Sequence, residues 1–402
     1  MIHKYCRFLA VTSKKHLKIS MAGVAVCASL ASVSNSYAGD TFDMGNDKSI
    51  TIGFGLRTSY TNLQNGAPNG TSNSNTFNVD NTRLYISAQL NKMISGTLNT
   101  DRDATGNIVL MDGFTEIALN EEFNLRAGRL LPPSDRSNLD GPFYLNTWQF
   151  PFVSQYPNVA IGRDNGMLAW GKPMDGKIVY SVGTFTGHNA IQGGSDAAGK
   201  ALFAGRLAIN FLDPEPAPAY YTASTYYGSK DILTLGFVFQ NQKNGVGSSA
   251  TAQGDYNSWN TDLLFEEKVA GDGVVTMEGA YYKYGLGAVD CGSGEPGSLP
   301  CNAAPNATNV GGLVAGTAYL ATLEYMFPQQ IGIGKLQPFV RIQNFHRNIS
   351  QTTDKQSDLG VNYVIDGHNA RISAVYSKLS DNRLVPSLAN QNQLIVGYQF
   401  QF

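Results

Sequence analysis

Segments in which apolar and polar side chains alternate recur along the chain from Ser49 to its last residue, Phe402. Most are about ten residues long, the length that a tilted β-strand needs to cross a bilayer. Clusters of Gly, Asn, Asp, Pro and Ser separate them, as turns require. No apolar run of about 18 residues, enough for a membrane helix, follows residue 38. Strands are therefore the elements expected to cross a membrane.

We predict sixteen such strands, at 49–62, 77–91, 94–103, 107–119, 123–131, 162–171, 177–186, 201–212, 232–240, 258–267, 274–284, 317–327, 336–347, 357–365, 370–379 and 393–402. The connections after odd-numbered strands are mostly long, as at 63–76, 132–161, 187–200, 241–256 and 285–316. Those after even-numbered strands are mostly short, as at 91–93, 172–176 and 366–368, and a proline turn lies at 213–218. Long external loops that alternate with short periplasmic turns, over an even strand count, are typical of bacterial outer-membrane proteins.

Composition agrees with this interpretation. Charged residues make up only 15% of the chain, which contains 43 glycines, 20 tyrosines and 20 phenylalanines. Outward apolar residues and inward polar residues give a transmembrane barrel this kind of near-neutral composition. The predicted fold is all-β, a 16-stranded antiparallel transmembrane β-barrel.

The N-terminus predicts a secretory signal peptide at residues 1–38, which leaves the barrel at 39–402. A basic front without acids precedes an apolar run at 19–33, and Ser36-Tyr37-Ala38 is a small-x-small cleavage site. Removal of the signal takes five of the 29 basic residues and none of the 31 acids, so 24 bases face 31 acids, a net charge of −7. This balance argues against nucleic acid as a partner.

Two cysteines, Cys291 and Cys301, remain after the signal is removed. They lie in a Gly- and Pro-rich loop of an exported chain, which predicts one disulfide. A metal site is less favoured because no histidine is near them in sequence. We expect no cofactor and no metal.

The connection at 132–161 is long and carries no helical or strand period. Irregular loops of this length are uncommon and usually functional. This one is too apolar for a disordered segment, because it contains six aromatic residues. They are Phe143, Tyr144, Trp148, Phe150, Phe152 and Tyr156. We predict that it is the third external loop, that it folds inward and that it narrows the bore. The alternative is an ordinary surface loop with an aromatic patch.

Sixteen strands leave an aqueous channel rather than a packed core. Strand parity places Arg57, Arg83, Arg126, Arg163, Arg206, Arg341, Arg371, Asp101, Asp103, Asp112, Glu116, Asp262, Glu266, Glu278 and Glu324 inward. The long loop adds Asp135, Arg136 and Asp140. Our hypothesis is that opposite charges set a transverse field at the constriction and tune ion preference. The alternative is that individual charges pair with one another and only support the wall. A slip of one residue would invert a strand, so Arg129 stays unassigned.

The last strand ends with the chain. Leu394, Val396, Tyr398, Phe400 and Phe402 share one face. A terminal phenylalanine behind alternating aromatics resembles the signal that outer-membrane proteins present to the barrel-assembly machinery, which is therefore an expected partner.

A resemblance to a known family covers Arg126 to Gly187, which includes LRAGRLLPPSDRSNL, AIGRDNGMLAWGK and YSVGTFTG. The stretch resembles the phosphate-selective porin O/P-like family of outer-membrane porins. Its members carry a Gly-Arg strand end before a proline-rich constriction loop. A strand start and a strand end of the family pattern follow, here Gly162, Arg163, Asp164 and Gly166, then Gly183, Phe185 and Gly187. The resemblance implies a homotrimer of sixteen-stranded barrels with the third external loop inside each pore.

The resemblance does not carry phosphate selectivity with it, because that property depends on a dense ladder of arginines and lysines. The lumen here is mixed in charge, so a general or differently selective pore for ions and small hydrophilic solutes is expected. The chain is not expected to be an enzyme, since the part after the signal has only His188, His346 and His368. An adhesin that uses the loops at 241–256 and 285–316 is the alternative function.

Overall fold

The computed structural model describes residues 39–103, 106–155, 162–187, 200–249, 252–287, 315–348, 351–380 and 390–402. The predicted signal peptide and the pair Cys291 and Cys301 lie outside these residues. The elements are β1 (Asp40–Gly45), β2 (Lys48–Leu63), β3 (Ser74–Gln89), β4 (Ile94–Arg102), β5 (Ile108–Ala118), β6 (Asn124–Leu130), α1 (Arg136–Tyr144), β7 (Asp164–Gly171), β8 (Ile178–Phe185), β9 (Leu202–Asn210), β10 (Ile232–Ser249), β11 (Ala252–Val269), β12 (Gly273–Gly285), β13 (Gly316–Met326), β14 (Gln330–Ile331), β15 (Gly334–Arg347), β16 (Thr353–Asp366), β17 (Ala370–Ser380) and β18 (Asn392–Gln401).

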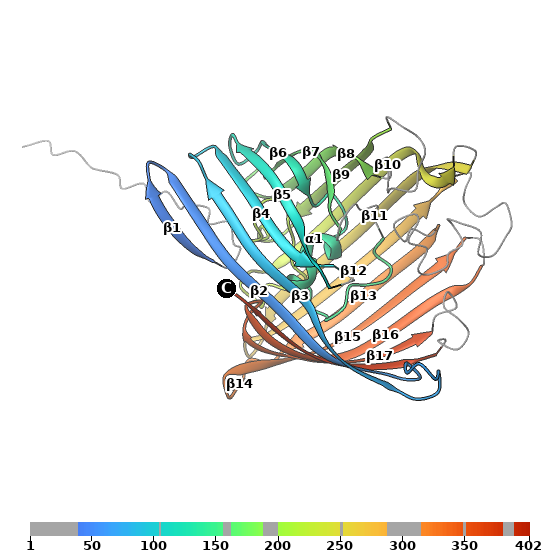
Figure 1. Ribbon diagram of the computed structural model, residues 1–402. Helices are drawn as coiled ribbons and strands as arrows, with labels where there is room; N and C mark the ends of the chain where they lie inside the picture. Colours follow the sequence, from blue (N-terminus) through green and yellow to red (C-terminus); the bar gives the residue numbers. More distant parts are fainter. Residues whose placement is uncertain are drawn as a thin grey trace, which may run out of the picture. The chain divides into compact units, whose positions relative to one another are not determined.

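The wall is a closed antiparallel barrel of sixteen strands, β2 to β13 and β15 to β18 (Figure 1). Each wall strand pairs with its neighbour in sequence, and β18 closes the ring on β2, from Gln393 opposite Leu63 to Gln401 opposite Gly55. The sixteen predicted segments each overlap one of these strands. The predicted fold class is therefore confirmed.

Alternation between the two faces explains why the strands were predictable. On β13, Leu323 is 45% exposed whereas the next residue, Glu324, is 1% exposed. Apolar side chains at outward positions suit contact with lipid, and polar side chains at inward positions suit a lumen. Separately, no helix in the described part of the chain is long and apolar enough to cross a membrane.

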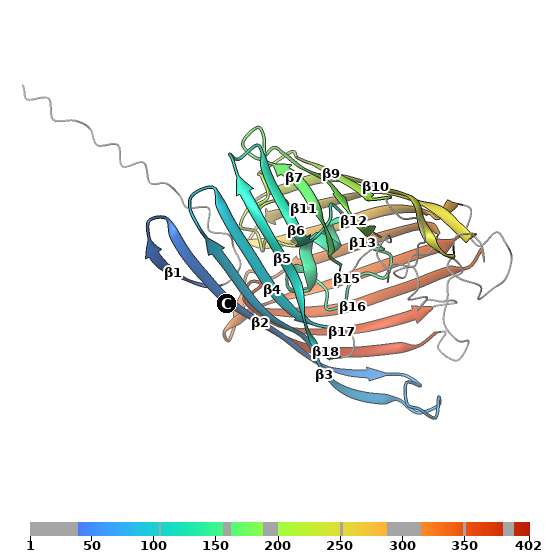
Figure 2. The same ribbon diagram turned by 45° about the horizontal axis from the view of Figure 1, so that its top comes forward.

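The predicted loop at 241–256 is wrong. The ladder between β10 and β11 continues through it, with Val246 opposite Gly254 and Ser249 opposite Ala252. Backbone hydrogen bonds hold such a hairpin without apolar side chains. The sequence there shows no outward apolar pattern, so it reads as a loop. Other arms are also long, and Figure 2 shows the hairpin of β2 and β3 projecting beyond its neighbours.

A short helix, α1, corrects the expectation that 132–161 is irregular throughout. Every residue from Arg136 to Phe143 is buried, so the helix has no solvent-exposed face and its sequence shows no amphipathic period. Gly141 has φ of 62°, a left-handed value that glycine adopts readily, and it bends the helix just before Pro142.

The C-terminal residue bonds to the first wall strand, β2, where the barrel closes. Phe402 and Phe54 exchange two backbone hydrogen bonds, of 2.9 and 3.0 Å. Just beyond, β1 pairs with the first residues of β2, with Asp40 opposite Ile52. The strand β1 was not predicted. It pairs with the part of β2 that β18 does not reach, and so covers a strand edge that could otherwise pair with another chain.

Candidate functional site

The constriction loop, as we call the connection at 132–161, lies against the inner face of the wall over its described residues 132–155, and Figure 1 shows its helix α1 inside the ring of strands. Wall arginines bond its backbone carbonyls. Arg57 Nη2 donates to Trp148 O at 2.6 Å, and Arg371 Nη1 donates to Leu145 O at 2.7 Å. Irregular backbone has no ladder partners, so its buried carbonyls need other donors. These arginines therefore fix the loop to the wall.

The side chain of Trp148 anchors the same loop. It is 4% exposed and packs with Phe339 and Ile395 of the wall. The guanidinium carbon of Arg57 lies 3.9 Å from its ring centroid, in cation–π geometry. A Cβ on Gly397 would lie only 2.5 Å from the indole, so glycine is what makes room for this ring.

We expect Gly397→Ala to displace Trp148, because the added methyl overlaps the ring and overpacking costs about 1–3 kcal/mol. The measurement is Trp148 fluorescence in a background that carries Trp170→Phe and Trp259→Phe. A red shift with greater quenching by iodide is expected. Gly205→Ala is the matched control, since its Cβ would meet nothing closer than 3.9 Å. Equal spectra for both variants would contradict the close approach.

A second segment, the inner turn (211–231), joins β9 to β10 at the end of the barrel opposite the constriction loop. Its ends pair, since Asp213 N donates to Asp231 O at 2.9 Å. Its middle folds into the lumen, where Tyr220 is 1% exposed and Ser224 is fully buried. Tyr220 belongs to the largest described apolar cluster, together with Leu139 of the constriction loop. The core of the molecule therefore lies inside the barrel.

The inner turn and the constriction loop bind each other through charge and hydrogen bonds. Arg136 donates from Nη2 and Nη1 to the two carboxylate oxygens of Glu215, at 2.6 and 2.8 Å. Thr222 and Ser224 donate their hydroxyls to Asp140. A bidentate arginine–carboxylate pair fixes geometry as well as charge. The two segments thus hold one arrangement across the lumen.

The sequence analysis predicted only a proline turn at 213–218 and missed the inner turn, the main element of the site that it did not predict. The sequence does contain a signal for this segment. The stretch 217–228 contains four tyrosines and no charged residue, and thirteen residues separate the predicted turn from the next predicted strand. The other connections at this end of the barrel are mostly short, so a long and apolar one indicates a segment that is buried in the protein.

Burial controls the ionisation of the loop carboxylates. Desolvation raises the pKa of Asp135 to about 6, although Ser154 donates a hydrogen bond to it. Desolvation and the nearby Glu278 raise the pKa of Asp140 well above its usual range. Burial also opposes ionisation of Glu215, but Arg136 outweighs it and holds the pKa of Glu215 below its ordinary value.

His368 joins both segments to the turn between β16 and β17. Its Nε2 donates to Thr225 O of the inner turn at 2.9 Å, since a carbonyl only accepts. The ring lies between Tyr144 and Tyr227, with centroids 4.9 and 4.8 Å away. Burial, reinforced by the charge of Arg371, lowers the pKa of His368 to about 3. The imidazole is therefore neutral at physiological pH.

Acid is expected to loosen the inner turn through His368. An opened state takes up a proton below the ordinary pKa of 6.5, whereas the closed state does so only near 3. The closed arrangement is therefore fully stabilised above about pH 6.5 and loses stability as the pH falls toward 3. Hydrogen exchange of the Ser224 amide, which donates to Tyr144 O, measures this opening.

The control for this prediction is His368→Gln, which keeps a side-chain donor for Thr225 O and removes the titration. Asp140 changes in the opposite sense, because an acid with a raised pKa stabilises the closed state as the pH falls. The difference between the two proteins therefore isolates His368. The same acid dependence in both would contradict its role.

All ten of the predicted channel residues are buried inside the barrel or in the constriction loop. The wall arginines are mostly paired, as Arg83 with Asp101, Arg126 with Glu116, Arg163 with Asp112 and Arg206 with Asp262. Among the predicted residues in the constriction loop, Arg136 pairs with Glu215, Asp135 accepts from Ser154 and Tyr282, and Asp140 accepts from the inner turn. Arg57 has no carboxylate within 4 Å among the described residues. The unassigned Arg129 faces outward with Asn165.

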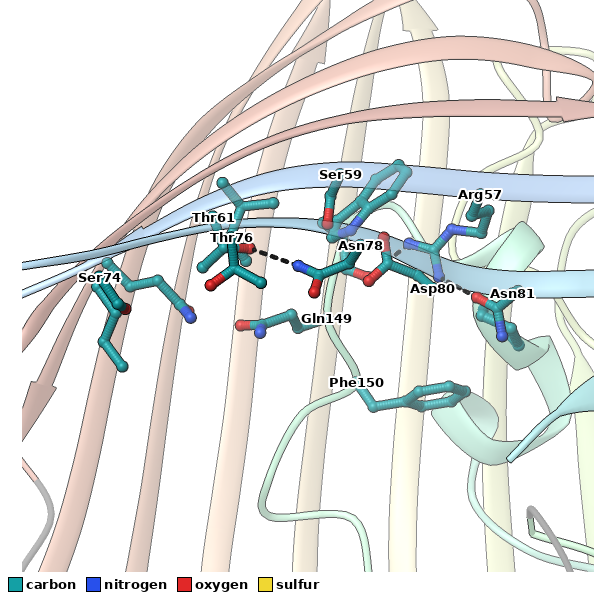
Figure 3. A pocket seen from close by; sticks show the side chains of 15 residues that line it. Arg57, Ser59, Thr61, Ser74, Thr76, Asn78, Asp80, Asn81, Gln149 and Phe150 are labelled. Carbon is teal, nitrogen blue, oxygen red and sulfur yellow. Dashed lines mark hydrogen bonds between the residues drawn. The ribbon is translucent and has the colours of Figure 1, made fainter. Parts of the chain in front are cut away.

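A cavity of about 560 Å³, which we call the vestibule, lies between the constriction loop and the end of the barrel where β2 meets β3 (Figure 3). The strands β2, β3 and β18 form its wall, and the constriction loop contributes Pro142, Trp148, Gln149 and Phe150. Figure 3 shows Phe150 on the side of the cavity opposite the polar side chains of β2 and β3.

A sequence model of the phosphate-selective porin O and P family matches residues 50–402. The chain belongs to this family. Solved structures with a similar fold include the anion-selective porin from Comamonas acidovorans, with 12% identity, 88% of this chain and 100% of that chain covered and a TM-score of 0.55. They also include OmpF of Salmonella typhi with daunomycin, with 11% identity, 90% and 100% covered and a TM-score of 0.55. The trimer form of OmpT from Vibrio cholerae is similar too, with 12% identity, 88% and 99% covered and a TM-score of 0.53. No curated protein matches the sequence.

The resemblance seen in the sequence is thus confirmed, and it extends over most of the chain. The protein is a porin that resides in the bacterial outer membrane and forms a channel for ions and small hydrophilic solutes. Nothing in the fold or in these relatives favours the adhesin alternative.

Proposed function

We propose that this porin is a general diffusion channel with little ion preference and without phosphate selectivity. The observation that carries this proposal is the balance of buried charge. The described residues include nine buried arginines and twelve buried carboxylates. Seven of the nine arginines form ion pairs with carboxylates. The other two, Arg57 and Arg371, donate to carbonyls of the constriction loop.

An anion-selective pore needs cationic groups that remain available to the solute. Here the inward arginines are engaged with carboxylates or with the constriction loop, so an entering anion finds no ladder of free donors among the described residues. The name of the Comamonas relative describes anion selectivity in that protein. Its selectivity does not carry over to a lumen with more carboxylates than arginines.

A transverse field remains part of the proposal. The carboxylates Glu266, Glu278 and Glu324 come from three neighbouring strands, β11 to β13, and none of the arginines in the described residues forms an ion pair with them. The two arginines that bond loop carbonyls and form no ion pair among the described residues, Arg57 and Arg371, come from β2 and β17. In the ring, β17 follows β13 after β15 and β16, and β2 follows β17 after β18. Such an arrangement orients polar solutes and favours neither sign of ion strongly.

We expect a small zero-current potential across a planar bilayer that holds the refolded porin in a tenfold KCl gradient. A channel that passes ions of one sign only gives a zero-current potential of about 59 mV. The potential of this porin is expected to lie within about 15 mV of zero, with the sign of a weak preference for cations. Block by millimolar phosphate is not expected. A potential near the ideal anion value, or phosphate block, would overturn the proposal.

Further features are proposed with it. A homotrimer is proposed because of the family and the trimer form of the similar OmpT, and the mass of the solubilised complex tests it.

Cleavage of the signal peptide after Ala38 is tested by N-terminal sequencing, which should begin at Gly39. A disulfide between Cys291 and Cys301 is tested by non-reducing peptide mapping. Recognition of Phe402 by the assembly machinery is tested by deleting it, which should lower the yield of folded barrel. We also propose that the porin has no enzymatic activity, which a hydrolase assay with ester and peptide substrates tests.

A further inference from the structure

The vestibule has an unusual lining for the charge-rich interior of this barrel. Only Arg57 and Asp80 among its lining residues carry a charge. The rest of its polar lining consists of hydroxyls and amides, which both donate and accept hydrogen bonds. The volume, about 560 Å³, falls within the range of small-molecule sites. The chemistry of the vestibule is therefore that of a binding site for an uncharged polar molecule.

The two sides of the cavity differ in character. Strands β2 and β3 present a polar side, which includes Ser59, Thr76 and Asn78. The ring of Phe150, which is 40% exposed, lies on the opposite side (Figure 3). An aromatic ring offers a flat apolar face, and exposed rings of this size in a cavity favour a ligand with an apolar surface of its own.

The charged residues of the vestibule do not make it an anion site. Arg57 is held by the carbonyl of Trp148 and by Asn81 Oδ1, at 2.6 and 3.0 Å. Asp80 lines the same cavity and repels an anion. The Nε of Arg57 and the Oδ2 of Asp80 are buried without a hydrogen-bond partner in the protein. Neither of these two atoms is exposed to the cavity, so its accessible polar groups are mainly the hydroxyls and amides of the lining.

We propose that the vestibule is a binding subsite for neutral saccharides, an inference that rests on the proposed function as a diffusion channel. A pyranose ring carries hydroxyls around its edge and C–H groups on its faces. The hydroxyls match the donors and acceptors of β2 and β3, and a C–H face packs on Phe150. Binding on the outer side of the constriction raises the local solute concentration and so speeds diffusion of sugars at low supply.

Single-channel recording tests the inference with one probe, a glucose disaccharide, added on the side of the long loops. Brief interruptions of the current are expected with the disaccharide and not with inorganic phosphate at the same concentration. Phe150→Ala is expected to shorten the interruptions about fivefold, and Asn78→Ala by a similar factor. Phe203→Ala is the matched control, because Phe203 is 43% exposed on the outer face of β9, and its interruptions should equal those of the unmodified porin.

The outcomes separate this inference from the proposed function. A folded barrel without conductance overturns both. A conducting barrel that phosphate blocks and the disaccharide does not also overturns both, because phosphate block contradicts the unselective channel and the absent interruptions contradict the saccharide subsite. Interruptions that are the same in all variants place sugar binding elsewhere and overturn the assignment. A conducting, weakly selective channel that the disaccharide never interrupts overturns the inference alone.

Discussion

Removal of the inner turn is expected to raise the single-channel conductance at least about twofold. The turn fills part of the lumen, where Tyr220, Ser224 and Thr225 are 1% exposed or less. The change is the replacement of residues 214–230 by Asn-Gly. It is compatible with the wall because Asp213 and Asp231 are already hydrogen bonded at 2.9 Å, and Asn-Gly suits a two-residue hairpin.

The side chains that the inner turn leaves behind do not prevent this outcome. Glu266 loses the donors that it has in Thr225, Tyr226 and Gly228, and Asp140 loses two hydroxyls. Water that enters the opened lumen hydrates these carboxylates instead, so their burial penalty falls. The loss of partners loosens the constriction loop, which adds to the conductance and to current noise.

The measurement needs proof of folding and a matched control. Heat-modifiable migration in a gel shows that the variant barrel is folded. The control is removal of the β14 arm, whose Gln330 and Ile331 are both exposed at the same end of the barrel. Its conductance is expected to be unchanged. A folded inner-turn variant with the conductance of the unmodified porin would show that the turn does not limit the pore.

The strands were predictable from the sequence because two solvents impose the alternation. Lipid selects the outward residues and the lumen selects the inward ones, as with Leu323 and Glu324. Where a strand passes beyond the membrane this selection ends, which is why the end of β10 looked like a loop. The strand period therefore reports the environment of a residue and not the extent of backbone pairing.

The face of each candidate residue was predictable, but its partner was not. Parity places Arg206 and Asp262 inward, yet the pair joins β9 to β11 across the intervening strand, and Asp262 also lies 3.7 Å from Arg136 of the constriction loop. Contacts of this kind depend on the register of several strands at once. The inner turn is a stronger case, since Thr222 meets Asp140 across 82 residues and neither segment has a period that reveals it.

Arg136→Met is expected to destabilise the closed arrangement of the constriction loop by about 3–5 kcal/mol. Arg136 is fully buried and donates to both carboxylate oxygens of Glu215 and to Ala223 O. Without it, Glu215 keeps hydrogen bonds from Tyr226 and Thr234 but has lost its positive partner. Breaking a buried pair from one side leaves an uncompensated charge, which costs more than the pair contributes.

A double variant separates charge from packing in this prediction. In Arg136→Met with Glu215→Gln, no lone charge is buried, and most of the stability is expected to return. Arg129→Met is the matched control, since Arg129 faces outward beside Asn165 and its loss is expected to cost at most about 1 kcal/mol. Hydrogen exchange of the Leu139 amide, which donates to Asp135 O at 3.1 Å, reports the opening of the loop.

A hundredfold or greater acceleration of this exchange is expected in the single variant, because each 1.4 kcal/mol is a factor of about ten. The double variant is expected to exchange within about tenfold of the unmodified porin. Equal acceleration in both variants would mean that the packing of the Arg136 side chain, and not the charge on Glu215, holds the loop. In that case the contact between the constriction loop and the inner turn depends on packing, and the exchange rate of the Leu139 amide should be the same in high salt as in low.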